Sequence, residues 1–259
     1  MLPTLQLGPL ALNTPGLILI IGIWLGLSLA EKRSPARGVP SVQLYNMSAL
    51  GMIAGILGAR LAYVLAHWQA FQGSPLSILS LNPKLLDVWG GAALGAAAML
   101  WYSQKVKQPL LRILDAYTPA AAVFMIAWHL SNLASGNAYG MPAALPWSID
   151  LLGALRHPVQ AYEALAALAI LGLLLKLDAR MKSSGNEGAF FLAFLALSAA
   201  SRLIFEAFRA EGELLFGAVR SAQAGAWLLL ALSLLLLKKR LKLSAEHALE
   251  DKNTHGNRF

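Results

Sequence analysis

Seven apolar stretches constrain the fold of this chain more than any other feature of its sequence. They lie at residues 14–30, 48–67, 87–102, 113–134, 158–177, 188–208 and 221–237. Each approaches or exceeds the length of about 20 residues that a helix needs to cross a bilayer. Backbone groups must be satisfied internally in lipid, so we expect each stretch to be helical. The fold class predicted is an all-α, polytopic membrane protein with a seven-transmembrane-helix bundle.

The composition agrees with a membrane protein and limits what else the chain contains. Hydrophobic residues make up 57% of the sequence and charged residues 13%, with a mean hydropathy of +0.58. A soluble domain carries about 25% charged residues. We expect one integral membrane domain over residues 1–242 and a polar, disordered tail over 243–259. The absence of cysteine excludes disulfides, thiolate metal ligands and a cysteine nucleophile.

The distribution of basic residues predicts the orientation in the membrane. Fifteen Lys and Arg residues fall on one side of the segments and four on the other, while Arg60 and Arg202 lie inside segments. The larger set is Lys32, Arg33, Arg37, Lys105, Lys107, Arg112, Lys176, Arg180, Lys182, Lys238, Lys239, Arg240, Lys242, Lys252 and Arg258. The smaller set is Lys84, Arg156, Arg209 and Arg220. The positive-inside rule therefore puts the N-terminus outside and the C-terminus in the cytoplasm. The net charge of +8 suits anionic lipid, and no basic strip interleaved with aromatic residues indicates nucleic acid.

A polar run stands at the mouth of the fifth segment, Arg156-His157-Pro158-Val159-Gln160-Ala161-Tyr162-Glu163. A helix start explains Pro158, which suits the first turn, and Arg156, which suits the headgroup zone. It does not explain Gln160 and Glu163, which are three residues apart and share one helix face. An ionisable group inside a membrane costs roughly 2.5–3.5 kcal/mol on insertion scales. We therefore expect this face to line a polar cavity.

The sixth segment carries a second polar face. Arg202, Glu206 and Arg209 lie on nearly one side of the predicted helix. Guanidinium groups bind phosphate oxygens in a bidentate manner, so this face indicates an anionic ligand. The alternative is that Arg202 and Glu206 only pair with each other, which lets both lie inside the bundle. If the cavity exists, Arg202 should lie near Asn132 and Gln160.

The remaining polar residues in the segments give weaker signals. Arg60, in the second segment, fits either packing within the bundle or contact with a ligand. His67, His129 and His157 have no carboxylate or second histidine at metal-ligand spacing, so we expect no metal site. The sequence also lacks a nucleotide-phosphate glycine loop, a Gly-x-Ser-x-Gly elbow and a His-Glu-x-x-His motif.

Taken together, these residues resemble one bacterial family. The polar run resembles the Arg-His-Pro-x-Gln-x-Tyr-Glu motif of the phosphatidylglycerol–prolipoprotein diacylglyceryl transferases. Ser201–Arg209 resembles the sixth-helix pattern of that family, Arg-Phe-x-x-Glu-Phe-x-Arg. Gly58–Val64 and Trp89–Gly95 are similar to motifs of its second and third helices, and Gln223 fits the start of its seventh. The resemblance spans about residues 14–240.

The resemblance implies transfer of a diacylglyceryl group from phosphatidylglycerol to the lipobox cysteine thiol of a preprolipoprotein. It implies release of glycerol 1-phosphate, a place among the lipids of the bacterial inner membrane, and no metal or organic cofactor. It also implies that Arg202, with Arg60 and Arg156, surrounds the phosphate. Separately from the resemblance, imidazole titrates near neutral pH, so His129 or His157 is a candidate base for the thiol.

The site expected from these arguments has a catalytic part and a substrate-binding part. The catalytic residues expected are His129, Asn132, Arg202 and Glu206. The substrate-binding residues expected are Arg60, Gly140, Arg156, His157, Gln160, Tyr162, Glu163 and Arg209.

Four positions depart from the pattern of the family, and each departure removes a charge or a donor. Pro15 replaces a tyrosine, Trp89 a histidine or tyrosine, His129 an arginine and Asn137 a glutamate. Asn132, Gly136 and Gly140 match the family signature. The departures leave open a second interpretation, a catalytically degenerate member that serves as a lipid-binding or membrane-complex assembly subunit. A small-solute transporter is disfavoured because the sequence has no internal repeat.

Overall fold

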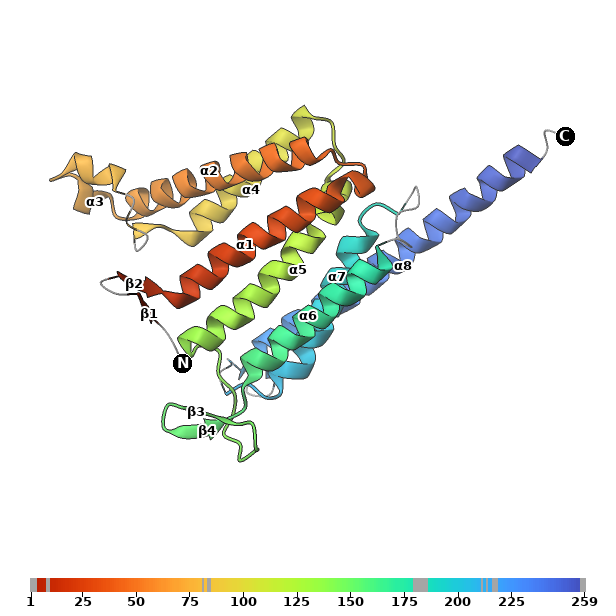
Figure 1. Ribbon diagram of the computed structural model, residues 1–259. Helices are drawn as coiled ribbons and strands as arrows, with labels where there is room; N and C mark the ends of the chain where they lie inside the picture. The colour runs from red at the N-terminus through yellow and green to blue at the C-terminus, as the bar shows by residue number, and fades with distance from the viewer. Residues whose placement is uncertain are drawn as a thin grey trace. The chain divides into compact units, whose positions relative to one another are not determined.

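The structure is a computed structural model that describes residues 4–7, 10–80, 82, 85–178, 186–210, 212, 214–215 and 219–256. Long helices dominate it (Figure 1). The chain divides into two compact units. One consists of Met1–Ala30 with Leu114–Phe259, and the other of Glu31–Ile113.

Long helices occupy all seven predicted segments. They are α1 (Thr14–Arg33), α2 (Ser41–Ala66), α4 (Val88–Lys105), α5 (Leu110–Ser135), α6 (Val159–Leu177), α7 (Ala189–Glu206) and α8 (Ser221–Gly256). Six of these, all except α4, are long and apolar enough within the described residues to cross a membrane. The chain is therefore an all-α, multi-pass membrane protein. The helix α4 is the short segment, rich in Gly and Ala, at residues 87–102.

Two helices differ in extent from their predicted segments. The helix α2 begins at Ser41, well before residue 48, directly after Pro40, whose backbone is extended (φ −56°, ψ 137°). Proline fixes φ and lacks an N–H, so it favours the edge of a helix over its interior. The helix α8 continues to Gly256, into the tail at 243–259. The disorder expected for this tail remains a prediction.

Short elements fill the connections, and the sequence analysis predicted none of them. The helical pieces are η1 (Ser34–Arg37), α3 (Trp68–Phe71) and η2 (Pro75–Leu79). Three antiparallel hairpins are formed by β1 (Thr4–Leu7) with β2 (Leu10–Asn13), β3 (Ile149–Leu151) with β4 (Ala154–Arg156), and β5 (Leu214–Leu215) with β6 (Val219–Arg220). Between β3 and β4, Leu152 and Gly153 have φ of 56° and 74°. Positive φ at both central residues is typical of the tight type I′ hairpin turn.

In the Glu31–Ile113 unit, α2 and α4 pack with their backbones in contact (Figure 1). A Cβ atom added to Gly91 would lie 2.9 Å from the carbonyl oxygen of Gly55, and one added to Gly95 would lie 2.9 Å from that of Gly51. Small residues at intervals of four let membrane helices approach this closely. The paired-glycine motif of the third segment is thus a helix-packing surface.

Arg60 anchors a loop in the same unit. Its side chain is buried, and its Nε and Nη1 atoms donate to the carbonyl oxygens of Ile78 and Leu85 at 2.8 and 2.9 Å. Its Nη2 atom donates to the carbonyl oxygen of Ser77. The guanidinium also lies over the ring of Phe71, 5.2 Å from the centroid. Three of its nitrogens are therefore occupied by backbone carbonyls, which favours packing within the unit as its structural role.

In the other unit, Asp115 joins α5 to the start of α7. Its carboxylate is buried and accepts hydrogen bonds from the backbone N–H groups of Gly188 and Phe191 at 2.7 and 2.8 Å. These amides belong to the first turn of α7, where no intrahelical acceptor exists and the helix dipole favours negative charge. Beside this contact, α5, α6 and α7 share an apolar core that consists of Ala122, Ile170, Leu174, Phe190, Ala193 and Phe194.

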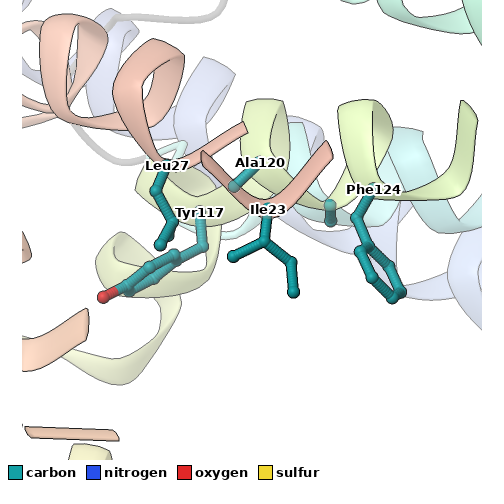
Figure 2. Close-up of a pocket in the computed structure, with 6 residues that line it drawn as sticks. Ile23, Leu27, Tyr117, Ala120 and Phe124 are labelled. Atoms are coloured by element: carbon teal, nitrogen blue, oxygen red, sulfur yellow. The ribbon is translucent and has the colours of Figure 1, made fainter. Parts of the chain in front are cut away.

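The helices α1 and α5 also approach closely, and a groove opens beside their contact. A Cβ atom added to Gly26 would lie 2.9 Å from the carbonyl oxygen of Ala120, and one added to Gly22 would overlap Ala127. Larger side chains flank this seam and line a cavity of about 250 Å³ (Figure 2). The lining residues are Ile23, Leu27, Tyr117, Ala120, Ala121 and Phe124. Both helices are candidate membrane spans, so hydrocarbon is the medium that matches this groove.

The contact between α2 and α4 predicts a sharp difference between two glycine substitutions. Gly95→Leu places a side chain against the backbone of α2 and should destabilise the protein by about 1–3 kcal/mol, the usual cost of overpacking. Gly172→Leu on α6 has no neighbour within 4 Å of the added Cβ atom and should leave stability unchanged or slightly raised. Thermal unfolding of both variants in detergent measures the difference. Equal melting temperatures would contradict the packing argument.

Candidate functional site

A cluster of charged side chains lies where α5, α6 and α7 come together. Glu163 is in the second turn of α6 and is only 2% exposed. Arg209 Nη2 donates to its Oε2 atom at 2.7 Å, and Arg202 Nη1 donates to its Oε1 atom at 3.3 Å. His129 Nδ1, from α5, lies 3.1 Å from Oε2. One buried carboxylate therefore holds three side chains from two other parts of the chain.

A second buried carboxylate, Glu206, contacts the same two arginines and is 1% exposed. Its Oε2 atom is 2.9 Å from Arg202 Nη2 and 3.9 Å from Arg209 Nε. Its Oε1 atom is 3.7 Å from Arg220 Nη1. Neither oxygen accepts an aligned hydrogen bond from the described residues. These contacts are therefore mainly charge attraction, which a low-dielectric interior strengthens.

Arg202 differs from the other arginines of the cluster in its exposure. Its side chain is 36% exposed, compared with 10% for Arg209 and 22% for Arg220. It contacts both carboxylates, so the ion pair with Glu206 expected as one alternative does form. A guanidinium has five donors, and the two carboxylate contacts leave several of them for a ligand. Arg202 is the member of the cluster best placed to meet an anion from outside.

The signature segment after α5 is built around the end of that helix. The backbone N–H groups of Gly136 and Asn137 both donate to the carbonyl oxygen of Asn132, at 2.9 and 3.1 Å. Gly136 has φ of 80°, the left-handed conformation with which such helix ends close. Gln160, fully buried on α6, donates from Nε2 to the carbonyl oxygen of Asn137 at 2.7 Å. Gln160 and Glu163 thus both face the interior from one side of α6.

Gly140 brings two distant segments into contact. It forms an isolated bridge with Arg209, and the neighbouring Met141 N–H donates to the carbonyl oxygen of Phe208 at 2.8 Å. A Cβ atom added to Gly140 would overlap the carbonyl oxygen of His157 and lie 2.7 Å from Val159 Cγ2. Only glycine lets the backbone approach this closely. The residue therefore fixes how the polar run and the end of α7 meet.

Aromatic side chains of the polar run and of the segment after α7 contact one another. The ring of His157 lies 5.3 Å from that of Phe208 and 6.2 Å from that of Tyr162, measured between centroids. Trp147 Nε1 donates to the Tyr162 hydroxyl oxygen at 2.7 Å. Among the described residues, neither His157 Nδ1 nor His129 Nδ1 has an aligned hydrogen-bond partner, and both atoms are buried. His157 is thus packed between rings, whereas the imidazole of His129 faces a carboxylate.

Several expected site residues lie elsewhere or are occupied differently. Arg156 donates from Nε and Nη1 to the carbonyl oxygens of Leu151 and Gly140, and it lies over the ring of Tyr139. Its guanidinium therefore stabilises the segment between α5 and α6 directly. Arg60 belongs to the other unit, where it holds backbone carbonyls. A phosphate contact for either arginine remains a prediction.

The contacts around the cluster differ from the neighbours expected for Arg202. It meets Glu163 and Glu206, while the amide of Gln160 is directed at Asn137. The pairing of His129 with Glu163 joins two helices far apart in the sequence, and spacing along the chain gives no signal for it. The sequence identifies Arg220 only as one of the cations in the loops. No local motif marks it, because its partners lie on a preceding helix.

Two of the positions that depart from the family pattern lie apart from this cluster in the sequence. Trp89 stands in the first turn of α4, in the Glu31–Ile113 unit, and is 83% exposed. Pro15 is half-buried in the first turn of α1. The other two, His129 and Asn137, belong to the geometry just described: one meets Glu163 and the other accepts from Gln160.

Comparison with known proteins agrees with these features. The family model of prolipoprotein diacylglyceryl transferase matches residues 3–238. A protein of Symbiobacterium thermophilum named phosphatidylglycerol–prolipoprotein diacylglyceryl transferase is 30% identical and aligns over 93% of both chains. Proteins of the same name from Streptococcus pyogenes and Prochlorococcus marinus are 28% and 24% identical. The alignments cover 91% of this chain in both cases, with 93% of the first relative and 87% of the second. The chain belongs to the prolipoprotein diacylglyceryl transferase family.

Proposed function

We propose that this protein transfers a diacylglyceryl group from phosphatidylglycerol to the lipobox cysteine thiol of a preprolipoprotein. Membership of the family supports this reaction. The observation in this chain that supports it most strongly is the partly exposed side chain of Arg202 beside two buried carboxylates. In the reaction a bond forms between the thiol sulfur and a glyceryl carbon, and the bond from that carbon to a phosphate oxygen breaks. Glycerol 1-phosphate leaves, and the thiol proton passes to a base.

Arg202 is the proposed partner of the phosphate. The phosphodiester of the donor lipid carries one negative charge, and the phosphomonoester that leaves carries up to two. Negative charge therefore builds up on the phosphate during the reaction, and a fixed guanidinium stabilises the transition state more than the bound lipid. Glu163 and Glu206 hold Arg202 from two sides, so its orientation is set before the substrate arrives.

His129 is the proposed base for the thiol. When a carboxylate accepts the N–H of one imidazole nitrogen, the other nitrogen is left as a proton acceptor. Glu163 Oε2 lies 3.1 Å from His129 Nδ1, and although the two atoms form no aligned hydrogen bond, the negative charge favours a proton on Nδ1 and leaves Nε2 as the basic atom. His157 has no such partner among the described residues and is packed between aromatic rings. Asn132, Gly140 and Gln160 support this arrangement by holding the loop that follows α5.

The second candidate function is that of a degenerate member, a lipid-binding or membrane-complex assembly subunit. The observation that favours it is the loss of a signature arginine at His129 and a signature glutamate at Asn137. In this case the cluster would bind anionic lipid without transferring it. The two candidates differ in one respect, because only the transferase needs a base for the acceptor thiol.

The proposed location is the bacterial inner membrane, with seven spans and the N-terminus outside. The helix α4, third in chain order, would complete the seven spans, with its glycine face packed against α2. On the side with few cations, Arg156, Arg209 and Arg220 are engaged in internal contacts. Because these three arginines already have partners within the protein, the cations that remain in loops lie almost all on the opposite side. This supports the orientation inferred from the positive-inside rule.

Two arginine substitutions should separate catalysis from stability. In Arg202→Gln each carboxylate keeps another cation, since Glu163 retains Arg209 and Glu206 retains Arg220. We expect kcat for lipid transfer to fall by about 10²–10³, as for loss of a transition-state donor, with little change in melting temperature. Arg209→Gln removes the shortest contact of buried Glu163 and should cost about 3–5 kcal/mol of stability. An Arg202 variant that unfolds as readily as the Arg209 variant would reduce Arg202 to a structural partner.

A base at position 129 predicts a specific change in the pH–rate profile. The substitution His129→Gln keeps a polar side chain but removes the titrating nitrogen, so kcat should fall by about 10²–10⁴. The limb of the profile in which the rate rises with pH should flatten at the same time. Transfer to a lipobox peptide, measured across the neutral pH range with phosphatidylglycerol as donor, gives both quantities. An unchanged profile would move the base to another residue.

The orientation makes a prediction for reporter fusions. A C-terminal reporter that is active only in the cytoplasm should be active, and the same reporter at the N-terminus should be silent, because fifteen cations lie on one side and four on the other. Substituting Lys105 and Lys107 with Gln serves as a probe of the bias and should weaken the preference. Activity at the N-terminus alone would reverse the topology.

A further inference from the structure

Arg220 occupies a place in the charge cluster that the reaction just proposed does not use. It ends β6, directly before α8, and its side chain is partly buried. Its Nη1 atom donates to the carbonyl oxygens of Glu206 and Arg209, both at 2.8 Å. The same nitrogen lies 3.7 Å from Oε1 of the buried Glu206 carboxylate. One guanidinium therefore contacts both the end of α7 and the carboxylate that holds Arg202.

The two carbonyl contacts place a cation at the C-terminus of α7, which ends at Glu206. The last carbonyl groups of a helix lack intrahelical donors and carry partial negative charge. Arg220 satisfies two carbonyls of this turn and the segment after it. Gly212 packs beside it, because an added Cβ atom would lie 3.3 Å from Arg220 Cδ and 3.4 Å from Glu206 Oε1. The position of Arg220 relative to Glu206 is thus fixed from several directions.

Arg220 also determines the net charge of the cluster. Among the described residues, the cluster contains three guanidinium groups, Arg202, Arg209 and Arg220, and two carboxylates, Glu163 and Glu206. These five groups by themselves leave one positive charge in excess. Without Arg220 the guanidinium groups and carboxylates balance, and Glu206 Oε1 loses the guanidinium that lies 3.7 Å away, which leaves more of the carboxylate charge to Arg202, 2.9 Å from Oε2. Arg202 would then be neutralised by the protein itself.

We propose that Arg220 is a positioning residue for anionic lipid: it shares the charge of Glu206 and so leaves Arg202 available to the phosphate of the donor. This inference rests on the proposed function, since it concerns the same site. Arg220 acts through Glu206 and Arg202 and does not touch the lipid. The surplus charge predicts a preference for phosphatidylglycerol, which carries a net negative charge, over zwitterionic phosphatidylcholine.

The test measures lipid binding separately from transfer. Full-length wild-type protein and variants in detergent micelles are titrated with phosphatidylglycerol and, in parallel, with phosphatidylcholine. We expect Arg220→Gln to weaken phosphatidylglycerol binding by about tenfold or more, which is within the range of one short-range charge interaction in a partly buried site. Phosphatidylcholine binding should change much less. Arg220→Lys, which keeps the charge, should retain most of the preference.

A double variant separates charge from helix capping. Arg220→Gln combined with Glu206→Gln removes one charge of each sign and restores the surplus, so the preference for phosphatidylglycerol should return to within about threefold of wild type. If Arg220 serves only to cap α7, the double variant will bind as poorly as the single one, and both will lose melting temperature equally. That result would overturn the proposal.

The outcomes also distinguish this inference from the proposed reaction. Wild-type protein whose binding of phosphatidylglycerol is weakened by Arg220→Gln but which never lipidates a peptide would support the charge argument and contradict the transferase. Wild-type protein that lipidates peptides while Arg220→Gln keeps the same KM and the same lipid preference would support the transferase and refute the role of Arg220.

Discussion

The burial of Glu163 is the constraint on which the site depends. A carboxylate that is 2% exposed within a membrane helix is stable only if cations and donors surround it, because its desolvation costs several kcal/mol. His129 on α5, Arg202 on α7 and Arg209 directly after α7 meet this need. Each of these side chains is held in a defined position as a result. The arrangement that solves the energetic problem of Glu163 is also the one that aligns groups for chemistry.

The backbone around the cluster is shaped to permit these contacts. Gly140 lets the segment after α5 pass against His157, and Gln160 fixes the carbonyl group of Asn137. The left-handed Gly136 ends α5 a short distance beyond His129. Because these features are local and mutually consistent, small changes in any of them should move the imidazole or the arginines relative to one another. This explains why polar residues gather at the start of an otherwise apolar helix, α6, and glycines in the segment before it.

Hydropathy and charge were sufficient to locate the long helices, because lipid leaves the backbone few alternatives. The three-residue spacing of Gln160 and Glu163 predicted a shared face, and both side chains are buried, while the polar cavity expected along that face stays a prediction. Helix periodicity, however, describes only one helix at a time. It could not pair His129 with Glu163, and it gave no reason to connect Arg220 with Glu206. Arg60 shows the same limit, since its acceptors are loop carbonyls with no sequence signature.

If the cluster serves lipid transfer, mass spectrometry of an acceptor peptide will reveal the product. Purified protein is incubated with phosphatidylglycerol and a peptide that carries a lipobox cysteine, with the Cys→Ser peptide as a control. We expect the cysteine peptide to gain the mass of one diacylglyceryl group, glycerol 1-phosphate to appear in equal amount, and the serine peptide to stay unmodified. Protein that binds phosphatidylglycerol yet leaves the cysteine peptide unmodified would contradict a role in lipid transfer and identify a degenerate member of the family.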